Sequence, residues 1–383
     1  MIKEYTRKLN LNRLLQHKSL FLLGPRQTGK STFLAKTYPQ APTFSLLEAD
    51  VFRDLSANPE LLRQRVKPSD RLVVVDEIQK LPVLLDEVQR MLDLNKGLRF
   101  ILTGSSARKL KRGGANLLAG RAWTAHMHPL VSVEVGPDRL LDQINRGGLP
   151  PVLDSALPHE DLKAYVGTYL QEEIRAEGLT RSIENFSRFL TVAGLSNGQV
   201  VNFTKAGNDA QVPPRTVREF YQVLEDTLVL HQLPPFQKTK KRKPVATSKY
   251  YFFDVGVANH LMNRREILPG SPEFGPVLEH LIFIEIKAYL DYERIDTPLT
   301  FWRTQTKYEV DFLIGDGIAV EVKGTEHVSD ADLKGLRSLS EEKKLKRKIV
   351  VSRETAPRTT EDAIEIWPIS GFLHALWQGE FQA

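Results

Sequence analysis

The residues most able to do chemistry form a phosphate-binding loop. Residues 24–31 read Gly-Pro-Arg-Gln-Thr-Gly-Lys-Ser, which fits the pattern G-x-x-x-x-G-K-[ST], and they follow the apolar run 20–23. In such a loop, backbone N–H groups surround phosphate oxygens, the lysine reaches the terminal phosphates, and the hydroxyl after it holds Mg²⁺. We therefore predict that Lys30 and Ser31 bind a nucleotide with its metal. The predicted nucleotide contacts are Gly24, Pro25, Arg26, Gln27, Thr28, Gly29, Lys30, Ser31 and Thr32.

A second motif supplies the groups that hydrolysis of the nucleotide needs. Residues 71–77 read Arg-Leu-Val-Val-Val-Asp-Glu, an apolar run that ends in two acids. We expect Asp76 to order the water shell of Mg²⁺ and Glu77 to polarise the attacking water. A third apolar run ends in Thr-Gly-Ser-Ser, in which Ser105 or Ser106 would sense the γ-phosphate. A capped turn between a strand and a helix would explain the same serines.

Short apolar runs must hold these side chains in place. The runs 20–23, 71–75 and 98–102 favour buried parallel strands, and the residues after the loop favour a helix. This order predicts an α/β fold with a parallel sheet of the P-loop NTPase type. We expect it to occupy a first domain of residues 1–138, because the closing Gly-Pro-Asp breaks the pattern.

Residues 139–243 are predicted to form a helical, winged-helix-like middle domain. Residues 147–151 read Gly-Gly-Leu-Pro-Pro, and this Gly-x-Pro resembles the element that packs a small helical domain against the nucleotide in signal-transducing P-loop ATPases; a simple turn is the alternative. The spacing of small and apolar residues over 202–224 indicates a helix-turn-helix, with Pro214 at a helix start. Arg215 and its neighbours would face a DNA groove, although lids and contact modules use the same fold.

The C-terminal third, expected as a domain of residues 244–383, holds a second group of ionisable residues. Residues 308–314 alternate polar and apolar, Gly-Asp-Gly signals a turn, and Ile-Ala-Val-Glu-Val-Lys follows. Side chains two apart on a strand share a face, so Glu321 and Lys323 point the same way and Asp311 meets them across the hairpin. A surface hairpin with an ion pair would have the same sequence.

Several motifs together resemble the prokaryotic AAA-type ATPases of the AAA_14 class. They are Gly-Pro-Arg-Gln-x-Gly-Lys at the loop, Asp-Glu-Ile-Gln-Lys-Leu-Pro at 76–82, Leu-Thr-Gly-Ser-Ser at 102–106 and Leu-Ala-Gly-Arg at 118–121. The resemblance continues through Tyr-Tyr-Phe-Phe-Asp-Val-Gly at 250–256 and Glu-Val-Asp-Phe to Trp-Pro at 367–368, so it covers nearly the whole chain. It implies an ATPase that uses ATP with Mg²⁺ and carries a C-terminal domain of unknown function.

Asp311, followed by Glu321-x-Lys323 on the next strand, also resembles the core of the PD-(D/E)XK nucleases. The resemblance implies a nuclease-like α/β domain in which Asp311 and Glu321 hold Mg²⁺ and Lys323 positions or activates the attacking water. A preceding helix often adds an acid in that superfamily, and Glu279 fits that place as a further metal ligand. Val310 stands where the superfamily pattern has proline.

An arginine is expected to complete the ATPase site. The transition state spreads negative charge over the γ-phosphoryl oxygens, and an arginine finger stabilises that charge. We predict Arg121 in this role, with Arg108 as the alternative. A structural arginine after a glycine turn would explain Arg121 equally well. Because such fingers often come from a neighbouring subunit, the prediction includes a homo-oligomer.

Composition narrows the class of protein. The chain has 383 residues, a net charge of +6 and no cysteine, which excludes a disulfide framework and a thiolate metal site. The first residues contain no apolar signal segment, and no run approaches the roughly 18 apolar residues of a membrane helix. We therefore expect a cytoplasmic protein with no membrane partner. Basic runs at 108–112, 238–243 and 343–348 favour contact with DNA, although each alone is typical of a solvated face.

These observations predict an Mg²⁺-dependent ATPase that acts on or binds DNA through a C-terminal nuclease-like domain. Lys30, Ser31, Asp76 and Glu77 would carry ATP hydrolysis. One alternative is an ATP-dependent switch or scaffold whose nuclease fold only binds partners. Another is a DNA translocase that does not cleave. Metal-dependent cleavage would separate the first prediction from both, and DNA-stimulated ATPase activity without cuts would mark the translocase.

Overall fold

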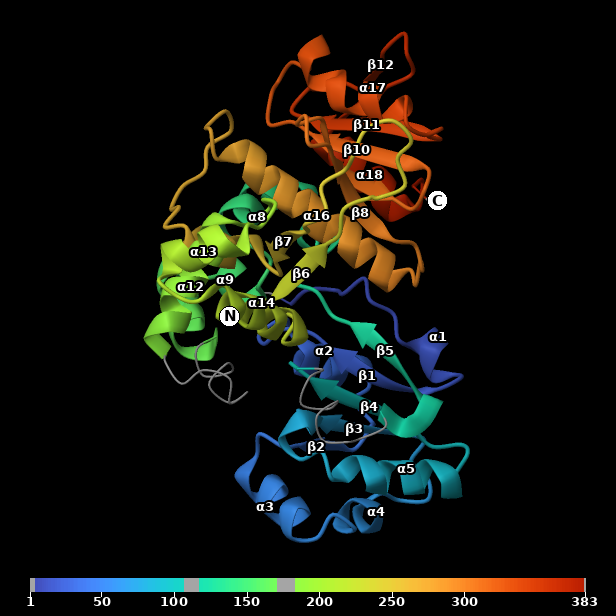
Figure 1. The fold of residues 1–383 in the computed structure, drawn as a ribbon. Coiled ribbons are helices and arrows are strands. Elements are labelled where there is room, and N and C mark those ends of the chain that lie inside the picture. The colour runs from blue at the N-terminus through green and yellow to red at the C-terminus, as the bar shows by residue number, and fades with distance from the viewer. Residues whose placement is uncertain (1–3, 107–116, 171–182, 382–383) are drawn as a thin grey trace. The chain divides into compact units, whose positions relative to one another are not determined.

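The computed structural model describes residues 4–106, 117–170 and 183–381, which form two compact units (Figure 1). The first unit, here called the nucleotide unit, contains Thr6–Pro129 and Val223–Val229. The second, here called the C-terminal unit, contains Met1–Tyr5, Leu130–Gln222 and Leu230–Ala383. The boundary expected after residue 138 lies near the first change of unit. The boundary expected at residue 243 has no counterpart in this division, because the helical middle and the C-terminal sheet belong to the same unit.

The nucleotide unit is built on a parallel sheet with the strand order β2-β3-β4-β1-β5. The strands are β1 (Ser19–Leu23), β2 (Thr43–Ser45), β3 (Leu72–Asp76), β4 (Arg99–Gly104) and β5 (Ala122–His126). Every residue of β1 is buried, as expected for a central strand with helices on both sheet faces. The predicted parallel sheet is therefore present. Since all neighbours are parallel, the segments that follow β1, β3 and β4 emerge at one edge, where ligands bind in open α/β sheets.

Helices of the nucleotide unit cover this sheet. They are α1 (Asn12–Leu15), α2 (Lys30–Thr37), α3 (Ala49–Ala57), α4 (Leu61–Arg65) and α5 (Leu84–Leu94), with short turns η1 (Ile78–Lys80) and η2 (Leu117–Gly120). The apolar residues of α5 recur at helical spacing: Leu84, Leu85, Val88, Met91 and Leu92 are all buried. They pack in one cluster with apolar residues of β1, β3 and β4.

The C-terminal unit begins with helices. They are α7 (Ser132–Val135), α8 (Leu140–Arg146), α9 (Pro150–Leu153), α10 (Pro158–Ala164), α12 (Ile183–Leu195), α13 (Phe203–Ala210) and α14 (Pro214–Asp226), with the 3₁₀ turn η3 (Pro137–Arg139) and the short π-helix η4 (Tyr165–Leu170). The last residues of α14, from Val223 on, are assigned to the nucleotide unit. The Asn202 side chain caps α13 by accepting from two backbone N–H groups, and Pro214 opens α14. The antiparallel strands β6 (Leu230–Leu233) and β7 (Lys249–Phe252) follow this helix pair.

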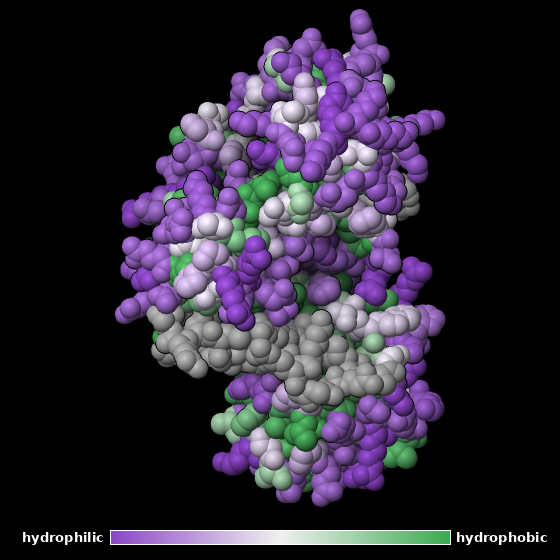
Figure 2. All heavy atoms as spheres, viewed as in Figure 1, coloured by the Kyte–Doolittle hydropathy of each residue, from purple (hydrophilic) through white to green (hydrophobic). Residues whose placement is uncertain are grey.

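A mixed sheet forms the rest of the C-terminal unit, with the order β12-β13-β11-β10-β9-β8. The strands are β8 (Leu299–Arg303), β9 (Glu309–Ile314), β10 (Ile318–Val322), β11 (Arg347–Ser352), β12 (Arg358–Thr359) and β13 (Glu365–Pro368). The strands β8, β9 and β10 are antiparallel neighbours, whereas β11 runs parallel to β10. In the face shown in Figure 2, hydrophilic residues cover most of the surface over β10 and β11.

The remaining helices frame the mixed sheet. They are α15 (Val255–Leu261), α16 (Phe274–Tyr292), α17 (Lys334–Ser340) and α18 (Ile369–Gln378), with the short turn η5 (Asp330–Leu333). Thus α16 precedes the three antiparallel strands, and α17 connects β10 to the parallel strand β11. Most of α16 is buried, including the ionisable residues His280 and Glu285. Within the described ranges, no helix combines the length and apolar character needed to cross a membrane.

Candidate functional site

The phosphate loop joins β1 to α2 as the motif predicted. Gly29, with φ +91°, and Gln27, with φ +62°, place the loop backbone in the left-handed region. Lys30 is buried, and its Nζ donates to the carbonyl oxygens of Gly24 at 2.7 Å and Pro25 at 2.9 Å. The ammonium group therefore lies within the curl of the loop. Gly24 is required by packing, because a Cβ there would lie 2.3 Å from the Met127 carbonyl oxygen.

Ser31 and Asp76 meet although they are far apart in sequence. The Ser31 hydroxyl donates to the Asp76 carboxylate at 3.1 and 3.2 Å. The Thr103 hydroxyl, at the end of β4, donates to Asp76 Oδ1 at 2.5 Å and accepts from the Glu77 N–H at 3.0 Å. Three neighbouring segments thus bring hard oxygen atoms together. This donor set fits Mg²⁺, which prefers one or two protein oxygens beside phosphate and water.

Glu77 is held beside this oxygen cluster. Its backbone is left-handed, with φ +60°, and its side chain is buried. The Gln79 amide donates to Glu77 Oε2 and to the Ser105 hydroxyl, the latter at 3.1 Å. Burial raises the pKa of Glu77, while Lys30 opposes that rise. The arrangement gives a carboxylate with more basic character than an exposed glutamate.

The remaining residues predicted for the nucleotide site lie in different surroundings. Thr28 is buried and its hydroxyl donates to the Pro25 carbonyl oxygen at 2.9 Å, so it braces the loop. The charge of Arg26, like that of Lys30, opposes the rise in the pKa of Glu77 that burial causes. Thr32 is exposed on the first turn of α2. Ser106 is buried one residue beyond Ser105, and the contact with Gln79 is made by Ser105.

Arg121 does not reach the phosphate loop of its own chain. It precedes β5, where Ala122 pairs with Ser19, whereas the loop follows Leu23 at the other end of β1. That separation is roughly 13 Å along the strands, at about 3.3 Å per residue. Arg121 instead makes a partly exposed ion pair with Asp93, with Nε 2.9 Å from Oδ1. The alternative arginine, Arg108, lies outside the described residues, as does the basic run 108–112.

The mixed sheet brings together the carboxylates predicted in the C-terminal third. Val320 pairs with Phe312, so Asp311 and Glu321 are next to each other on β9 and β10. Asp311 Oδ2 accepts from the Val322 N–H at 2.8 Å, and Lys323 Nζ lies 2.6 Å from Glu321 Oε1. Burial and the neighbouring carboxylates raise the pKa of Asp311 well above its ordinary range. Burial also raises the pKa of Glu321 to about 7, against the effect of Lys323.

A lysine that the sequence analysis missed lies in the middle of this cluster. Lys249 on β7 is buried, and its Nζ is 3.0 Å from Glu279, 2.7 Å from Glu309 and 3.9 Å from Asp311. Burial alone would lower the pKa of Lys249, but the carboxylates around it raise the value well above the ordinary one. The Tyr251 hydroxyl donates to Glu279 Oε1 at 2.5 Å. The run Lys-Tyr-Tyr-Phe was visible in the sequence, but it resembles an ordinary buried strand.

Two carboxylates of this cluster, Asp311 and Glu321, are placed to bind a metal ion. No three His, Cys, Asp or Glu side chains in the described part of the chain are arranged to hold a metal. Glu279, predicted as a third ligand, is instead paired with Lys249, because that ammonium group lies between α16 and β9. Glu321 Oε2, however, is buried and has no hydrogen-bond partner. Asp311 and Glu321 therefore match the one or two carboxylates that Mg²⁺ commonly takes from a protein.

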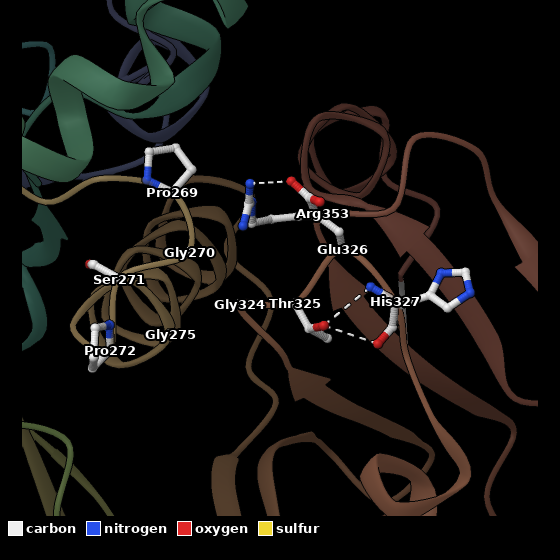
Figure 3. A pocket seen from close by; sticks show the side chains of 10 residues that line it. All are labelled: Pro269, Gly270, Ser271, Pro272, Gly275, Gly324, Thr325, Glu326, His327 and Arg353. Carbon is white, nitrogen blue, oxygen red and sulfur yellow. Dashed lines mark hydrogen bonds and ion pairs between the residues drawn. The ribbon is translucent and has the colours of Figure 1, made fainter.

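A polar pocket of about 640 Å³ opens at the segment that follows Lys323 (Figure 3). Gly324 and Gly275, at the start of α16, approach closely there, since a Cβ on Gly324 would lie 2.9 Å from the Gly275 Cα. Figure 3 shows Arg353 turned toward Glu326, and their ion pair measures 2.5 Å. The pocket therefore already contains a paired cation and anion.

Three family models match successive segments of the chain. Residues 16–136 match the family described as "AAA domain". Residues 137–267 and 274–372 match two families described as domains of unknown function, DUF8612 and DUF4143. Residues 16–136 are thus similar to the AAA_14 family of P-loop domains, and the two matched segments that follow are similar to families described as domains of unknown function.

Similar proteins include two from mycobacteria. An uncharacterized protein of Mycobacterium tuberculosis and one of Mycobacterium bovis are each 28% identical over 328 residues, which cover 82% of this chain and 72% of the relative. Among solved structures, a Signal Transduction ATPase with Numerous Domains (STAND) protein with a tetratricopeptide repeat sensor, from Pyrococcus horikoshii, is 14% identical, with a TM-score of 0.23. That alignment covers 76% of this chain and 48% of the other.

Proposed function

We propose that the chain is an Mg²⁺-dependent ATPase whose nucleotide unit binds ATP at the loop 24–31 and hydrolyses it. One observation carries this proposal: Ser31 and Asp76, 45 residues apart in sequence, lie 3.1 Å apart beside Lys30 and Glu77. That grouping has no role in filling a core, but it matches the needs of a nucleotide with its metal. Mg²⁺, when bound, would neutralise charge on the phosphates.

The residues of the nucleotide unit divide the work of hydrolysis. The loop N–H groups and Lys30 hold the phosphates, while Ser31 and Asp76 offer oxygen atoms to the metal. Glu77 accepts a proton from the attacking water, and Gln79 together with Ser105 fixes the direction of its carboxylate. Arg121 faces away from this edge in its own chain. We therefore propose that it acts on the loop of a neighbouring subunit in a homo-oligomer.

Glu77→Gln tests the ATPase proposal. Glutamine keeps the shape of the side chain but cannot accept a proton, so turnover should fall roughly 100-fold or more while ATP binding persists. The readouts are steady-state phosphate release and a titration with a fluorescent ATP analogue. Glu48→Gln, at an exposed carboxylate of the same unit, is the matched control. If the Glu77→Gln protein hydrolyses ATP at the wild-type rate, Glu77 is not the general base.

We further propose that the C-terminal unit is a nuclease-like module that acts on DNA. The supporting observation is that Asp311 and Glu321 lie side by side on β9 and β10, with Lys323 just after β10 and paired with Glu321. Helix α16 supplies Glu279 to the same cluster through Lys249. The order of elements around this cluster also supports the proposal: the helix α16 is followed by three antiparallel strands, then by the helix α17 and by the parallel strand β11. Asp311 and Glu321 would hold Mg²⁺, which supplies charge for phosphodiester hydrolysis, and Lys323 would position the water.

Cleavage of single-stranded, duplex and branched DNA with Mg²⁺ or Mn²⁺ tests this second proposal. Asp311→Ala and Glu321→Ala should each abolish cleavage, because one remaining carboxylate holds the metal too weakly. Lys323→Ala should slow cleavage while metal binding persists. Asp296→Ala, at an exposed acid of the same unit, is the control. No cleavage by the wild-type protein on any substrate would favour the switch, or the translocase if DNA stimulates ATP turnover.

A further inference from the structure

Two basic runs that lie a hundred residues apart in sequence are joined in the C-terminal unit by one buried carboxylate. Glu342, just after α17, has a side chain with 0% exposure. Its Oε2 accepts from the backbone N–H groups of Lys240 at 2.8 Å and Lys241 at 2.7 Å, and its Oε1 lies 3.1 Å from Arg242 Nη1. Although burial favours a higher pKa, these donors hold the pKa of Glu342 below its ordinary value. Glu342 therefore fixes the segment 238–243 against the segment 343–348.

The junction leaves a set of exposed lysines, here called the lysine surface. Its members are Lys238, Lys240, Lys241, Lys243, Lys344 and Lys346. None of them forms an ion pair with a described residue. The nearby acids are already used: Glu341 pairs with Arg242 at 2.8 Å, and Asp316 pairs with Lys343 at 3.0 Å. Uncompensated positive charge is thus concentrated here, in a chain whose total net charge is only +6.

Aromatic rings lie beside two other cations of the same basic runs. The Arg242 guanidinium lies over the ring of Tyr308 at 5.4 Å, and 37% of Tyr308 is exposed. Lys343 Nζ lies 4.3 Å from the centre of the Phe236 ring. Neither basic run has an exposed large apolar side chain. A surface that binds lipid usually adds such side chains to its lysines, whereas a nucleic-acid surface combines lysines with stacking rings.

We propose that the lysine surface binds the phosphate backbone of a single-stranded nucleic acid, with Tyr308 available to stack on a base. This proposal rests on the proposed action of the C-terminal unit on DNA. The position of the surface supports it. The Lys346 N–H donates to the Gly317 carbonyl oxygen at 2.7 Å, so the surface adjoins the turn between β9 and β10. Glu321 lies four residues along β10, roughly 13 Å away. A nucleic-acid single strand bound on the lysine surface would therefore lie within reach of Asp311 and Glu321.

Binding of a fluorescent 20-nucleotide single strand, measured by anisotropy over a range of salt concentrations, tests this proposal. The triple substitution Lys240→Gln, Lys241→Gln and Lys344→Gln should weaken binding roughly 100-fold at 0.1 M salt. It should also reduce the slope of log K against log salt by about 2, because each phosphate contact contributes about 0.7. The control is Lys67→Gln, Lys163→Gln and Lys205→Gln, which removes equal charge from exposed lysines elsewhere.

Glu342→Gln separates an arranged surface from simple attraction to net charge. The substitution makes the protein more positive, but an amide cannot satisfy both the backbone N–H groups and Arg242. The joined surface should loosen, and the single strand should bind at least 5-fold more weakly. Tighter binding would overturn the proposal. So would unchanged DNA binding by the triple-lysine variant, even if that variant lost binding to vesicles of anionic lipid.

The same assay distinguishes this proposal from cleavage. Asp296→Ala, at an exposed acid of the same unit, should bind the single strand as tightly as the wild-type protein, within about 2-fold. Loss of DNA binding in the triple-lysine variant would support the lysine surface even if no DNA is ever cut. A wild-type protein that cuts DNA while the triple-lysine variant binds and cuts at the same level would overturn the surface and leave the cleavage proposal standing.

Discussion

Lys30 is the residue on which nucleotide binding depends most directly. Its ammonium group is buried within the loop and donates hydrogen bonds to loop carbonyl oxygens. A phosphate oxygen carries more negative charge than a carbonyl oxygen, so it is the stronger acceptor for this group. The position was predictable, because a phosphate loop is a local motif whose residues are nearly consecutive. The same holds for Ser31 and for Asp76, which ends a recognisable apolar strand.

Lys30→Ala should abolish tight ATP binding. Loss of a charge-assisted contact in a desolvated site costs on the order of 2–5 kcal/mol, which is a fall in affinity of about 30-fold or more. Isothermal titration with ATP and Mg²⁺ measures this effect. Lys36→Ala removes an equal charge from an exposed position on the same helix and should leave affinity unchanged. Equal affinities of the Lys30 variant and the wild-type protein would argue against binding at this loop.

Gln79 and Lys249 show which interactions of single residues the sequence could not reveal. Gln79 was visible within the Asp-Glu-Ile-Gln run, but its contact with Ser105 depends on how β4 ends beside the turn after β3. Lys249 is a similar case, because its partners Glu279 and Glu309 come from two other elements. Interactions of this kind are set by tertiary packing, so spacing along the chain carries no signal for them.

Gln79→Ala should lower kcat by about 10- to 100-fold and leave the ATP dissociation constant unchanged, because it frees the Glu77 carboxylate without touching the phosphate contacts. Rapid-quench kinetics and nucleotide titration together separate the two effects. Gln89→Ala on α5 is the control. A parallel loss of ATP affinity would show that Gln79 supports the loop as a whole.

Among the elements of the C-terminal unit, one buried carboxylate ties three helices together. Glu285 on α16 accepts from the Ser132 N–H at 2.7 Å and the Ser132 hydroxyl at 2.8 Å, at the start of α7. It also accepts from the Trp377 indole N–H on α18 at 2.7 Å. Burial raises the pKa of Glu285 to about 7, although these donors oppose the rise. The carboxylate is therefore harder to ionise in the folded protein than in the unfolded chain.

This shift gives the stability of the C-terminal unit a definite pH dependence. A carboxyl group whose folded pKa exceeds its unfolded value of 4.5 contributes stability below that value, and the contribution is lost as pH rises toward 7. The shift corresponds to about 3 kcal/mol. Urea unfolding, followed by tryptophan fluorescence from pH 4.5 to 8, should show a smaller decline for Glu285→Gln than for wild type. Parallel curves for the two proteins would contradict this account.

The elements themselves were largely predictable, but their grouping was not. The apolar runs that became β1, β3 and β4 are short and bounded by turn signals, so a parallel sheet followed from their pattern. The hairpin of β9 and β10 was equally visible from its alternation and its turn. The association of the helical middle with the rest of the C-terminal unit could not be inferred, because it depends on long-range contacts such as that of the Gly148 N–H with Asp254.

At the scale of the whole molecule, the two candidate sites lie in different compact units. Lys30 and Glu77 belong to the nucleotide unit, and Asp311 and Glu321 belong to the C-terminal unit. Each site has its own hydrogen-bond partners, and the partners described above come from the same unit as the site. Chemistry at one site should therefore survive the loss of the other, whatever coupling exists between them.

The measurement that tests the account most directly is ATP turnover and DNA cleavage by the same preparations of wild-type protein, Glu77→Gln and Asp311→Ala. We predict that Glu77→Gln loses ATP turnover by roughly 100-fold while it still binds ATP, and that Asp311→Ala keeps full ATP turnover without cleaving DNA. Wild-type protein without ATPase activity, or a Glu77→Gln variant that turns over ATP at the wild-type rate, would contradict the assignment of the nucleotide site.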